Sequence, residues 1–229
     1  MILNDDKCAV VKDITEEMIF KKAMTSDYSK LESLSLMAMR VTSLITGSGL
    51  MRKMSKLQEL NLSNNRISTL HPLGEVKTLQ TLNLNSNRIS EISEISLPML
   101  THLSLDYNLI TVMKGLRGLK KLETLSLCGN LIKIASLRET GLMLHNLNEL
   151  HLEKNQITDL KKLMGFPKLI EITLDHNPIK SIDGSAFSSC PDLKLLSISY
   201  IKLPNYQGDL RFLRLCPNLE TLRMNSCFT

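Results

Sequence analysis

The chain has 229 residues, of which 43% are hydrophobic, but aromatic residues supply only 4% and tryptophan is absent. A buried core must therefore be aliphatic, and no apolar run approaches the roughly 20 residues of a membrane-spanning helix. The formal net charge of +5 is modest for this length. It does not by itself indicate nucleic-acid binding, which is usually marked by a concentrated stripe of basic residues.

An amphipathic helix is predicted near the N-terminus, over residues 14–24. Thr15 is a suitable N-cap, acidic residues follow in the first turn, and basic residues come in the last turn, as the helix dipole favours. Its apolar side chains include Met18, Ile19 and Phe20. We expect residues 1–30 to form an N-terminal segment whose helix covers the first unit that follows. A helix that binds in a partner's groove is the alternative.

From residue 31 onward, a unit of the form LxxLxLxxNxI recurs at intervals of 21 to 26 residues. Two weaker copies and an incomplete ninth accompany six consecutive full copies. The nine units, called repeats 1 to 9 below, begin at Leu31, Leu57, Leu79, Leu100, Leu122, Leu147, Leu169, Leu193 and Leu219. Such periodicity predicts a solenoid of about nine repeats over residues 31–229, the last one incomplete.

Each recurring position of the unit has a physical role. The LxL segment is a short strand whose leucines point into the coil while the residue between them faces out. The asparagine at the turn can donate and accept hydrogen bonds with its amide. We expect it to bind the backbone where the strand bends away, in a ladder shared between repeats.

This unit is that of leucine-rich-repeat proteins. Its spacing of about 22 residues, with a second apolar stretch such as 70–76, resembles the class found in the nuclear regulatory subunit of type-1 protein phosphatase. The resemblance implies an α/β solenoid with a curved parallel sheet on the concave face and short helices and turns on the convex face. The longer units at 133–146, 180–192 and 203–218 leave room for helices or extended loops. Residues 14–23 resemble the segment before the first repeat in several ciliary leucine-rich-repeat proteins and the start of the spliceosomal A-prime protein.

The last repeat begins a strand at Leu219 and ends without a recognisable cap. An uncapped sheet edge is a pairing liability. We therefore expect a fragment of a longer repeat protein, or a second chain that covers this end.

Partners of such solenoids dock on the concave face, which positions 3, 5, 7 and 8 of each repeat build. Six acidic residues fall there, against only Lys154 and Arg223 as bases. Basic residues gather instead on the loops that ascend to the strands, at Lys114, Arg117, Lys120, Lys121, Lys161, Lys162 and Lys168. The candidate partner-binding residues are His102, Asp106, Tyr107, Glu149, His151, Glu153, Glu171, Asp175, His176 and Tyr200.

These residues predict a protein partner with a basic surface, centred on repeats 4 to 7, because opposite charge steers association and exposed tyrosine is enriched at interfaces. The alternative is that an exposed sheet needs polar side chains for solubility. Charge reversal at Glu149, Glu153, Glu171 and Asp175 is expected to abolish binding without lowering thermal stability. Direct binding of nucleic acid is not expected, because an acidic face repels phosphates.

The sequence contains no nucleophile motif, phosphate loop or dinucleotide fingerprint. Metal binding by His151, Glu171, Asp175 and His176 is disfavoured because a nearly flat sheet spreads its side chains instead of converging them. We therefore expect a non-enzymatic protein without cofactor, metal or small-molecule substrate.

Cys190 and Cys216, which occupy equivalent places in consecutive repeats, are predicted to be a reduced, buried pair, with a disulfide as the alternative.

The acidic start of the chain lacks the pattern of a secretory signal, and the five cysteines show no metal-ligand spacing. These features favour an intracellular, cytoplasmic site, with cytoskeleton, cilium or nucleus as the candidate compartments.

The first functional interpretation is a protein–protein interaction scaffold or adaptor, cytoskeletal or ciliary. A regulatory subunit of a protein phosphatase and a component of a ribonucleoprotein assembly are the first two alternatives. A bacterial or secreted adhesion repeat is a further alternative, which the missing signal segment disfavours.

Overall fold

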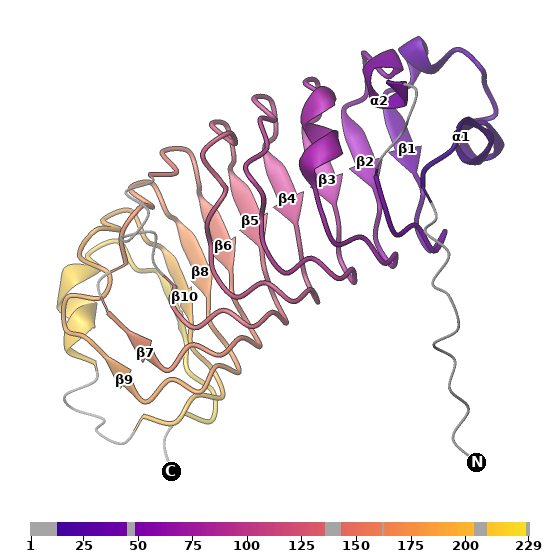
Figure 1. Ribbon diagram of the computed structural model, residues 1–229. Coiled ribbons are helices and arrows are strands. Elements are labelled where there is room, and N and C mark those ends of the chain that lie inside the picture. The colour runs from indigo at the N-terminus through magenta and orange to yellow at the C-terminus, as the bar shows by residue number, and fades with distance from the viewer. Residues whose placement is uncertain (1–12, 45–48, 136–142, 162, 204–209, 228–229) are drawn as a thin grey trace, which may run out of the picture.

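A computed structural model describes residues 13–44, 49–135, 143–161, 163–203 and 210–227. In these ranges the chain winds into a solenoid, and each repeat adds one strand to a parallel sheet of nine strands (Figure 1). Repeats that follow one another in sequence are therefore neighbours in space. The predicted solenoid is confirmed. The first twelve residues of the N-terminal segment and Lys162 lie outside the described residues.

The sheet has the order β1-β2-β3-β4-β5-β6-β8-β10-β11. Its strands are β1 (Ser33–Ser35), β2 (Glu59–Asn61), β3 (Thr81–Asn83), β4 (His102–Ser104), β5 (Thr124–Ser126), β6 (Glu149–His151), β8 (Glu171–Thr173), β10 (Leu195–Ser197) and β11 (Thr221–Arg223). The register is constant, because the central residue of each strand pairs with the central residue of the next, as Leu60 does with Leu82. A constant register carries every position of the repeat into a straight column across the sheet.

The core is a continuous column of leucine and isoleucine side chains inside the coil. The strand leucines, such as Leu103, Leu125 and Leu150, are almost completely buried. Phenylalanine enters the core toward the C-terminal end, where the rings of Phe187 and Phe212 lie 5.2 Å apart between centroids. The expected aliphatic core is therefore confirmed, and its buried aromatic side chains among the described residues are Tyr28, Phe166, Phe187 and Phe212.

A ladder of buried asparagines joins successive repeats, as the sequence predicts. In repeat 6, the Nδ2 of Asn155 donates to the carbonyl oxygens of Leu127 in the preceding repeat and Leu152 in its own, at 2.9 and 3.0 Å. Its Oδ1 accepts from the backbone N–H of Ile132 at 3.0 Å. The same three bonds recur at Asn65, Asn87, Asn108, Asn130 and Asn177.

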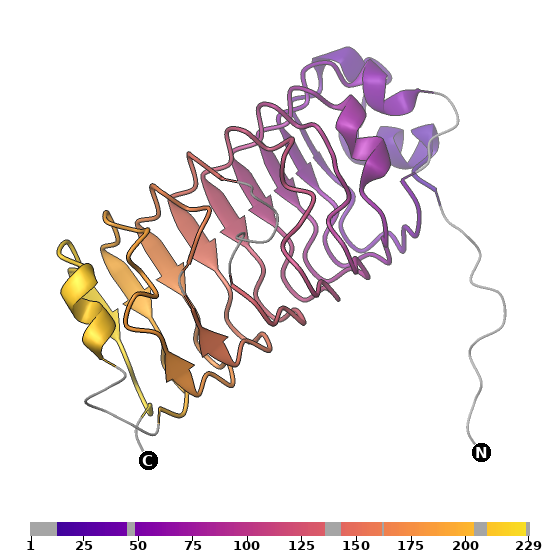
Figure 2. The ribbon, with the colours of Figure 1, turned by 60° about the vertical axis from the view of Figure 1, so that its left-hand side comes forward.

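Short helices and turns form the wall opposite the nine-stranded sheet. They include the helix α2 (Leu50–Lys53) and the 3₁₀ helices η2 (His71–Glu75) and η4 (Arg211–Leu215). Two further strands, β7 (Asp159–Leu160) and β9 (Ser181–Ile182), pair in parallel as a separate small sheet on this wall (Figure 2). The sequence predicted helices or loops in the 180–192 segment. In the structure, residues 181–182 of that segment pair with β7, and turns occupy residues 184–189.

The helix α1 (Glu16–Ala23) lies at the N-terminal end of the solenoid, against β1 (Figure 1). Thr15 caps it by accepting from the N–H of Met18, and the side chains of Met18 and Ile19 extend the core past repeat 1. An ion pair of 2.6 Å between Glu16 and Lys53 links the helix to α2. Phe20 differs from the expected core role, because it faces outward and is 49% exposed.

At the other end of the sheet, all three residues of β11 are exposed, and Leu222 keeps 37% of its surface accessible. Within the described residues, no helix is both long and apolar enough to cross a membrane.

The asparagine ladder gives a direct test. Replacement of Asn155 by alanine leaves the buried N–H of Ile132 without a partner. The carbonyls of Leu127 and Leu152 each lose one of two donors, because Asn130 and Asn177 still bind them. We expect a loss of about 1–3 kcal/mol in the free energy of unfolding. Urea unfolding measures it. Gln156→Ala is the matched control, since the neighbouring Gln156 side chain is exposed. Equal stabilities of the two variants would contradict the ladder's role.

Candidate concave binding face

The ten candidate residues lie on the outer face of the nine-stranded sheet or at the ends of its strands. His102, Glu149 and Glu171 begin β4, β6 and β8, and His151 ends β6. Asp106, Glu153 and Asp175 stand at position 7 of their repeats, just after the strands. Tyr107, His176 and Tyr200 occupy position 8. All ten are exposed or half-buried, so each can be reached from solvent.

The glutamates of β6 and β8 form the most unusual pair on this face. Glu149 and Glu171 are register partners on adjacent parallel strands, which lie about 4.8 Å apart. Like charges placed directly opposite each other in a sheet are destabilising. In the described part of the chain neither carboxylate forms an ion pair with lysine or arginine. The sheet therefore brings two acidic residues into register on neighbouring strands, and among the described residues neither is neutralised by a lysine or arginine.

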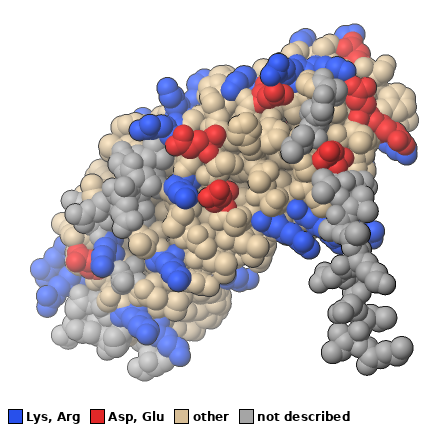
Figure 3. Space-filling view, in the orientation of Figure 1, with Lys and Arg blue, Asp and Glu red and all other residues tan. Residues whose placement is uncertain are grey.

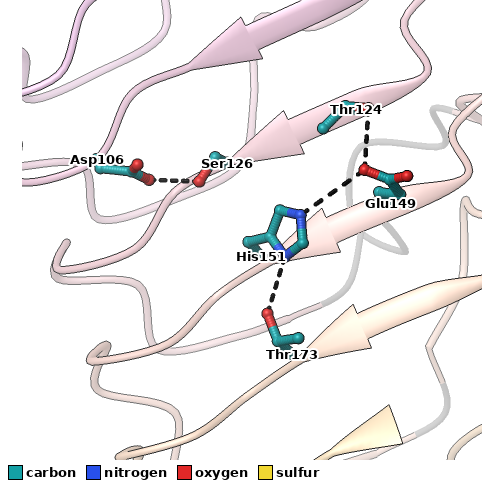
Figure 4. Close-up of polar contacts among 6 residues, drawn as sticks. All are labelled: Asp106, Thr124, Ser126, Glu149, His151 and Thr173. Atoms are coloured by element: carbon teal, nitrogen blue, oxygen red, sulfur yellow. Dashed lines mark hydrogen bonds and ion pairs between the residues drawn. The ribbon is translucent and has the colours of Figure 1, made fainter. Parts of the chain in front are cut away.

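A threonine hydroxyl and a histidine ring contact the Glu149 carboxylate (Figure 4). The hydroxyl of Thr124 donates to Glu149 at 3.3 Å, and Nε2 of His151 lies 3.9 Å from the same carboxylate. The other ring nitrogen of His151 lies 3.0 Å from the hydroxyl of Thr173. These contacts orient Glu149 and His151, and they leave the Glu149–Glu171 pair open to a ligand.

Two of the predicted acids have a structural task instead. Oδ1 of Asp106 accepts from the hydroxyl of Ser126 at 2.5 Å and from the N–H of Cys128 at 2.8 Å (Figure 4). Asp175 accepts in the same way from the hydroxyl of Ser197 and the N–H of Ser199. Each carboxylate thus ties its repeat to the next one.

Glu153 stands between these two aspartates along the column of position 7. One of its carboxylate oxygens, Oε2, is buried, and no hydrogen-bond partner for it exists among the described residues. Nearby, burial raises the pKa of the Cys128 thiol, and the negative charges of Glu153 and Asp106 raise it further. The column is thus locally electronegative, and Glu153 has an unused capacity to accept a donor.

Position 8 builds a second column along the ends of the strands. Its residues adopt left-handed backbone conformations, with φ of 54° at Tyr107 and Lys154 and 57° at His176. The rings of His176 and Tyr200 stack with centroids 4.3 Å apart and planes 6° apart. The ammonium of Lys154 lies 6.0 Å from the ring centroid of Tyr107, within reach of a cation–π contact.

Gly129 makes room in this column. A Cβ there would lie 2.6 Å from the Tyr107 ring, so a larger residue would displace the tyrosine. Tyr107 and Tyr200 each remain 53% exposed.

The predicted site therefore divides into two surfaces of different chemistry. We call Glu149, His151, Glu153 and Glu171 the acidic patch. We call Tyr107, Lys154, His176 and Tyr200 the aromatic edge. His102 belongs to neither, and its Nδ1 contacts the hydroxyl of Thr101 at 2.8 Å.

The basic residues predicted on the connecting loops are exposed, apart from Lys162, which lies outside the described residues. Figure 3, in which the connecting loops face the viewer, shows basic side chains along the margins of this side and at its C-terminal end. The concave positions 3, 5, 7 and 8, by contrast, carry six acidic residues against two basic ones.

Two chemical alternatives can be compared with the geometry. Across the ranges that the structure describes, no group of three or more His, Cys, Asp or Glu side chains is arranged to hold a metal ion. Cys190 and Cys216 are free and buried, as predicted for a reduced pair. Burial, and the nearby Cys216, raise the pKa of Cys190 to about 12.

Family models match more than half of the chain. A model described as leucine-rich repeats in two copies matches residues 55–97 and 145–186, and a second leucine-rich-repeat model matches residues 77–132. This is a leucine-rich-repeat protein. Proteins of this family and fold typically serve as interaction modules rather than as enzymes. No curated protein matches the chain in sequence.

Solved structures agree with this assignment. Internalin C2 from Listeria monocytogenes is 25% identical, with a TM-score of 0.70 over 91% of both chains. The leucine-rich-repeat domain of APL1 is 28% identical, with a TM-score of 0.64 over 81% of this chain. TLR13, in a complex with ssRNA13, is 24% identical, with a TM-score of 0.73 over 85% of this chain. The chain spans 47% of the APL1 domain and 28% of TLR13.

Sequence reasoning missed the hydrogen bonds made by position 7. A signal for them is present, because each aspartate at position 7, Asp106 and Asp175, is followed by a serine at position 5 of the next repeat. That pairing distinguishes an acid that ties repeats together from an acid that is free to bind.

Substitution of Asp175 is therefore expected to lower the stability of the protein. This differs from the expectation from sequence, in which charge reversal at four acids including Asp175 leaves thermal stability unchanged. Asp175→Ala removes the acceptor of Ser197 and Ser199 and is expected to lower the free energy of unfolding by roughly 1–3 kcal/mol. Asp175→Asn keeps an acceptor oxygen and is expected to retain most of the stability. Thermal melting of both variants tests this assignment, and an Ala variant as stable as the Asn variant would refute it.

Proposed function

We propose that this protein is a non-enzymatic interaction module whose acidic patch binds a basic segment of a partner protein. The observation that carries the proposal is the Glu149–Glu171 register pair. It is unfavourable in the free protein, and a cation between the two carboxylates would turn repulsion into attraction. No cofactor or small-molecule substrate takes part in this function.

An arginine of the partner fits the pair best. A guanidinium presents several N–H donors in a planar fork that matches carboxylate oxygens. Glu149 and Glu171 stand on adjacent strands, so their carboxylates provide two such acceptors one sheet spacing apart. Glu153, which is half-buried, adds a third carboxylate just after β6. The patch therefore suits a segment with more than one basic residue.

The remainder of the surface favours this orientation of the partner. Exposed lysines and arginines on the connecting loops repel a basic segment, whereas the concave face attracts it. Such separation of charge steers association and rejects wrong orientations more than it raises affinity. The same reasoning argues against direct contact between the acidic patch and nucleic-acid phosphates.

We propose a cytoplasmic scaffold or adaptor, cytoskeletal or ciliary, on the likeness of residues 14–23 to ciliary leucine-rich-repeat proteins. The repeat spacing supports a regulator of a protein phosphatase as the second candidate. In that case the basic segment belongs to an enzyme whose activity changes on binding. The identity of the captured partner distinguishes the two.

The patch is tested by the double variant Glu149→Lys, Glu171→Lys. We expect it to lose binding of a fluorescent hexa-arginine peptide in anisotropy titrations at low salt, because repulsion replaces attraction. The same variant is expected to lose a basic protein that the wild type retains from eukaryotic lysate.

The matched control is Glu91→Lys, Glu94→Lys, which makes the same charge change on exposed residues of the repeat 3 connecting segment. It is expected to bind as the wild type does. Equal losses in both double variants would show a general charge effect and would reject the acidic patch as the binding site.

A further inference from the structure

A hollow of about 400 Å³ lies at the ends of the strands in repeats 7 and 8, beside the aromatic edge. Its lining consists of His176, Asn177, Pro178, Ile179, Lys180, Tyr200 and Lys202. Apart from Asn177 and Ile179, these side chains are exposed, so the hollow opens to solvent. Its volume falls within the range of about 300–1,000 Å³ that ligand pockets occupy.

The hollow is cationic, in contrast to the acidic patch. Lys180 and Lys202 stand on its rim, and neither forms an ion pair with a described carboxylate. Among the described residues that line it there is no aspartate or glutamate. Two acids of the same repeat have other hydrogen-bond partners: Asp175 accepts from Ser197 and Ser199 of the next repeat, and Asp183 accepts from Ser185. The hollow is thus lined by two lysines that form no ion pair with a described carboxylate.

The aromatic side chains that line the hollow, those of His176 and Tyr200, are carried by backbone that the fold holds in place. The stacked rings of His176 and Tyr200 present a flat surface. Their backbone N–H groups donate to Ser199 and Asn225 of the following repeats at 3.0 and 2.7 Å. Asn177, next to His176, belongs to the buried asparagine ladder. Because its supports are part of the fold, this surface needs little ordering when a ligand binds.

We propose that this hollow binds an aromatic phosphate, in the form of a phosphorylated tyrosine side chain on a partner protein. Two lysines match the double negative charge of a phosphate monoester. The adjacent rings offer a stacking or edge contact to the phenyl group. An open hollow admits a side chain presented from a protein surface without enclosing it. This site is separate from the acidic patch and does not depend on it.

The test uses the full chain and three capped amino acids: N-acetyl phosphotyrosine amide, N-acetyl phosphoserine amide and N-acetyl tyrosine amide. We expect phosphotyrosine to bind most tightly in NMR titrations and to shift the amide signals of Tyr200 and Lys202. Phosphoserine is expected to bind more weakly because it lacks the ring. Binding of tyrosine as tight as that of phosphotyrosine would overturn the proposal.

The variant Lys180→Gln, Lys202→Gln is expected to weaken phosphotyrosine binding about tenfold or more, since it removes both charged donors. Lys133→Gln is the matched control, because Lys133 holds the place of Lys180 in repeat 5, where Gly129 stands in the place of the aromatic His176. Tyr200→Leu is expected to reduce the preference for phosphotyrosine over phosphoserine. Unchanged affinity in the double lysine variant, with an unchanged melting temperature, would overturn the proposal.

Discussion

The buried asparagine ladder is the interaction on which the rest of this structure depends. Each amide joins the backbone of its own strand to the repeat before it, with the same three hydrogen bonds in six consecutive repeats. In these six repeats the ladder anchors the backbone just after each strand, while the same register extends to the strands at both ends of the sheet. Since the register is constant, a residue type that recurs at one position forms a column, and both proposed sites are products of such columns.

Most of the fold can be predicted from sequence because one short unit determines it. The leucines of LxxLxLxxNxI specify an inward strand, the asparagine specifies the turn, and repetition specifies parallel stacking. The limits of the prediction lie where a residue depends on a neighbouring repeat. Phe20 follows the helical pattern yet faces solvent. The small sheet of β7 and β9 arises from the alignment of two longer connecting segments, which no single repeat encodes.

The sequence predicts on which face the candidate residues lie, but it does not predict which of them contact one another. Counting acids on the concave face placed Glu149, Glu171 and Asp175 together, although only the two glutamates oppose each other. Asp175 serves the next repeat, a role that depends on Ser197 and Ser199 and therefore on spatial pairing. Likewise, the left-handed backbone at position 8 sets His176 and Tyr200 apart from the strand face. Charge and aromatic content alone do not distinguish these environments.

Repulsion between Glu149 and Glu171, which a basic partner would relieve, is measurable in the free protein. The experiment is a double-mutant cycle on Glu149→Gln and Glu171→Gln, followed by urea unfolding at low salt. We predict that the two residues destabilise each other, with a coupling energy of about 0.2–1 kcal/mol that decreases as salt screens it. A coupling of zero, or one that shows mutual stabilisation, would contradict the account.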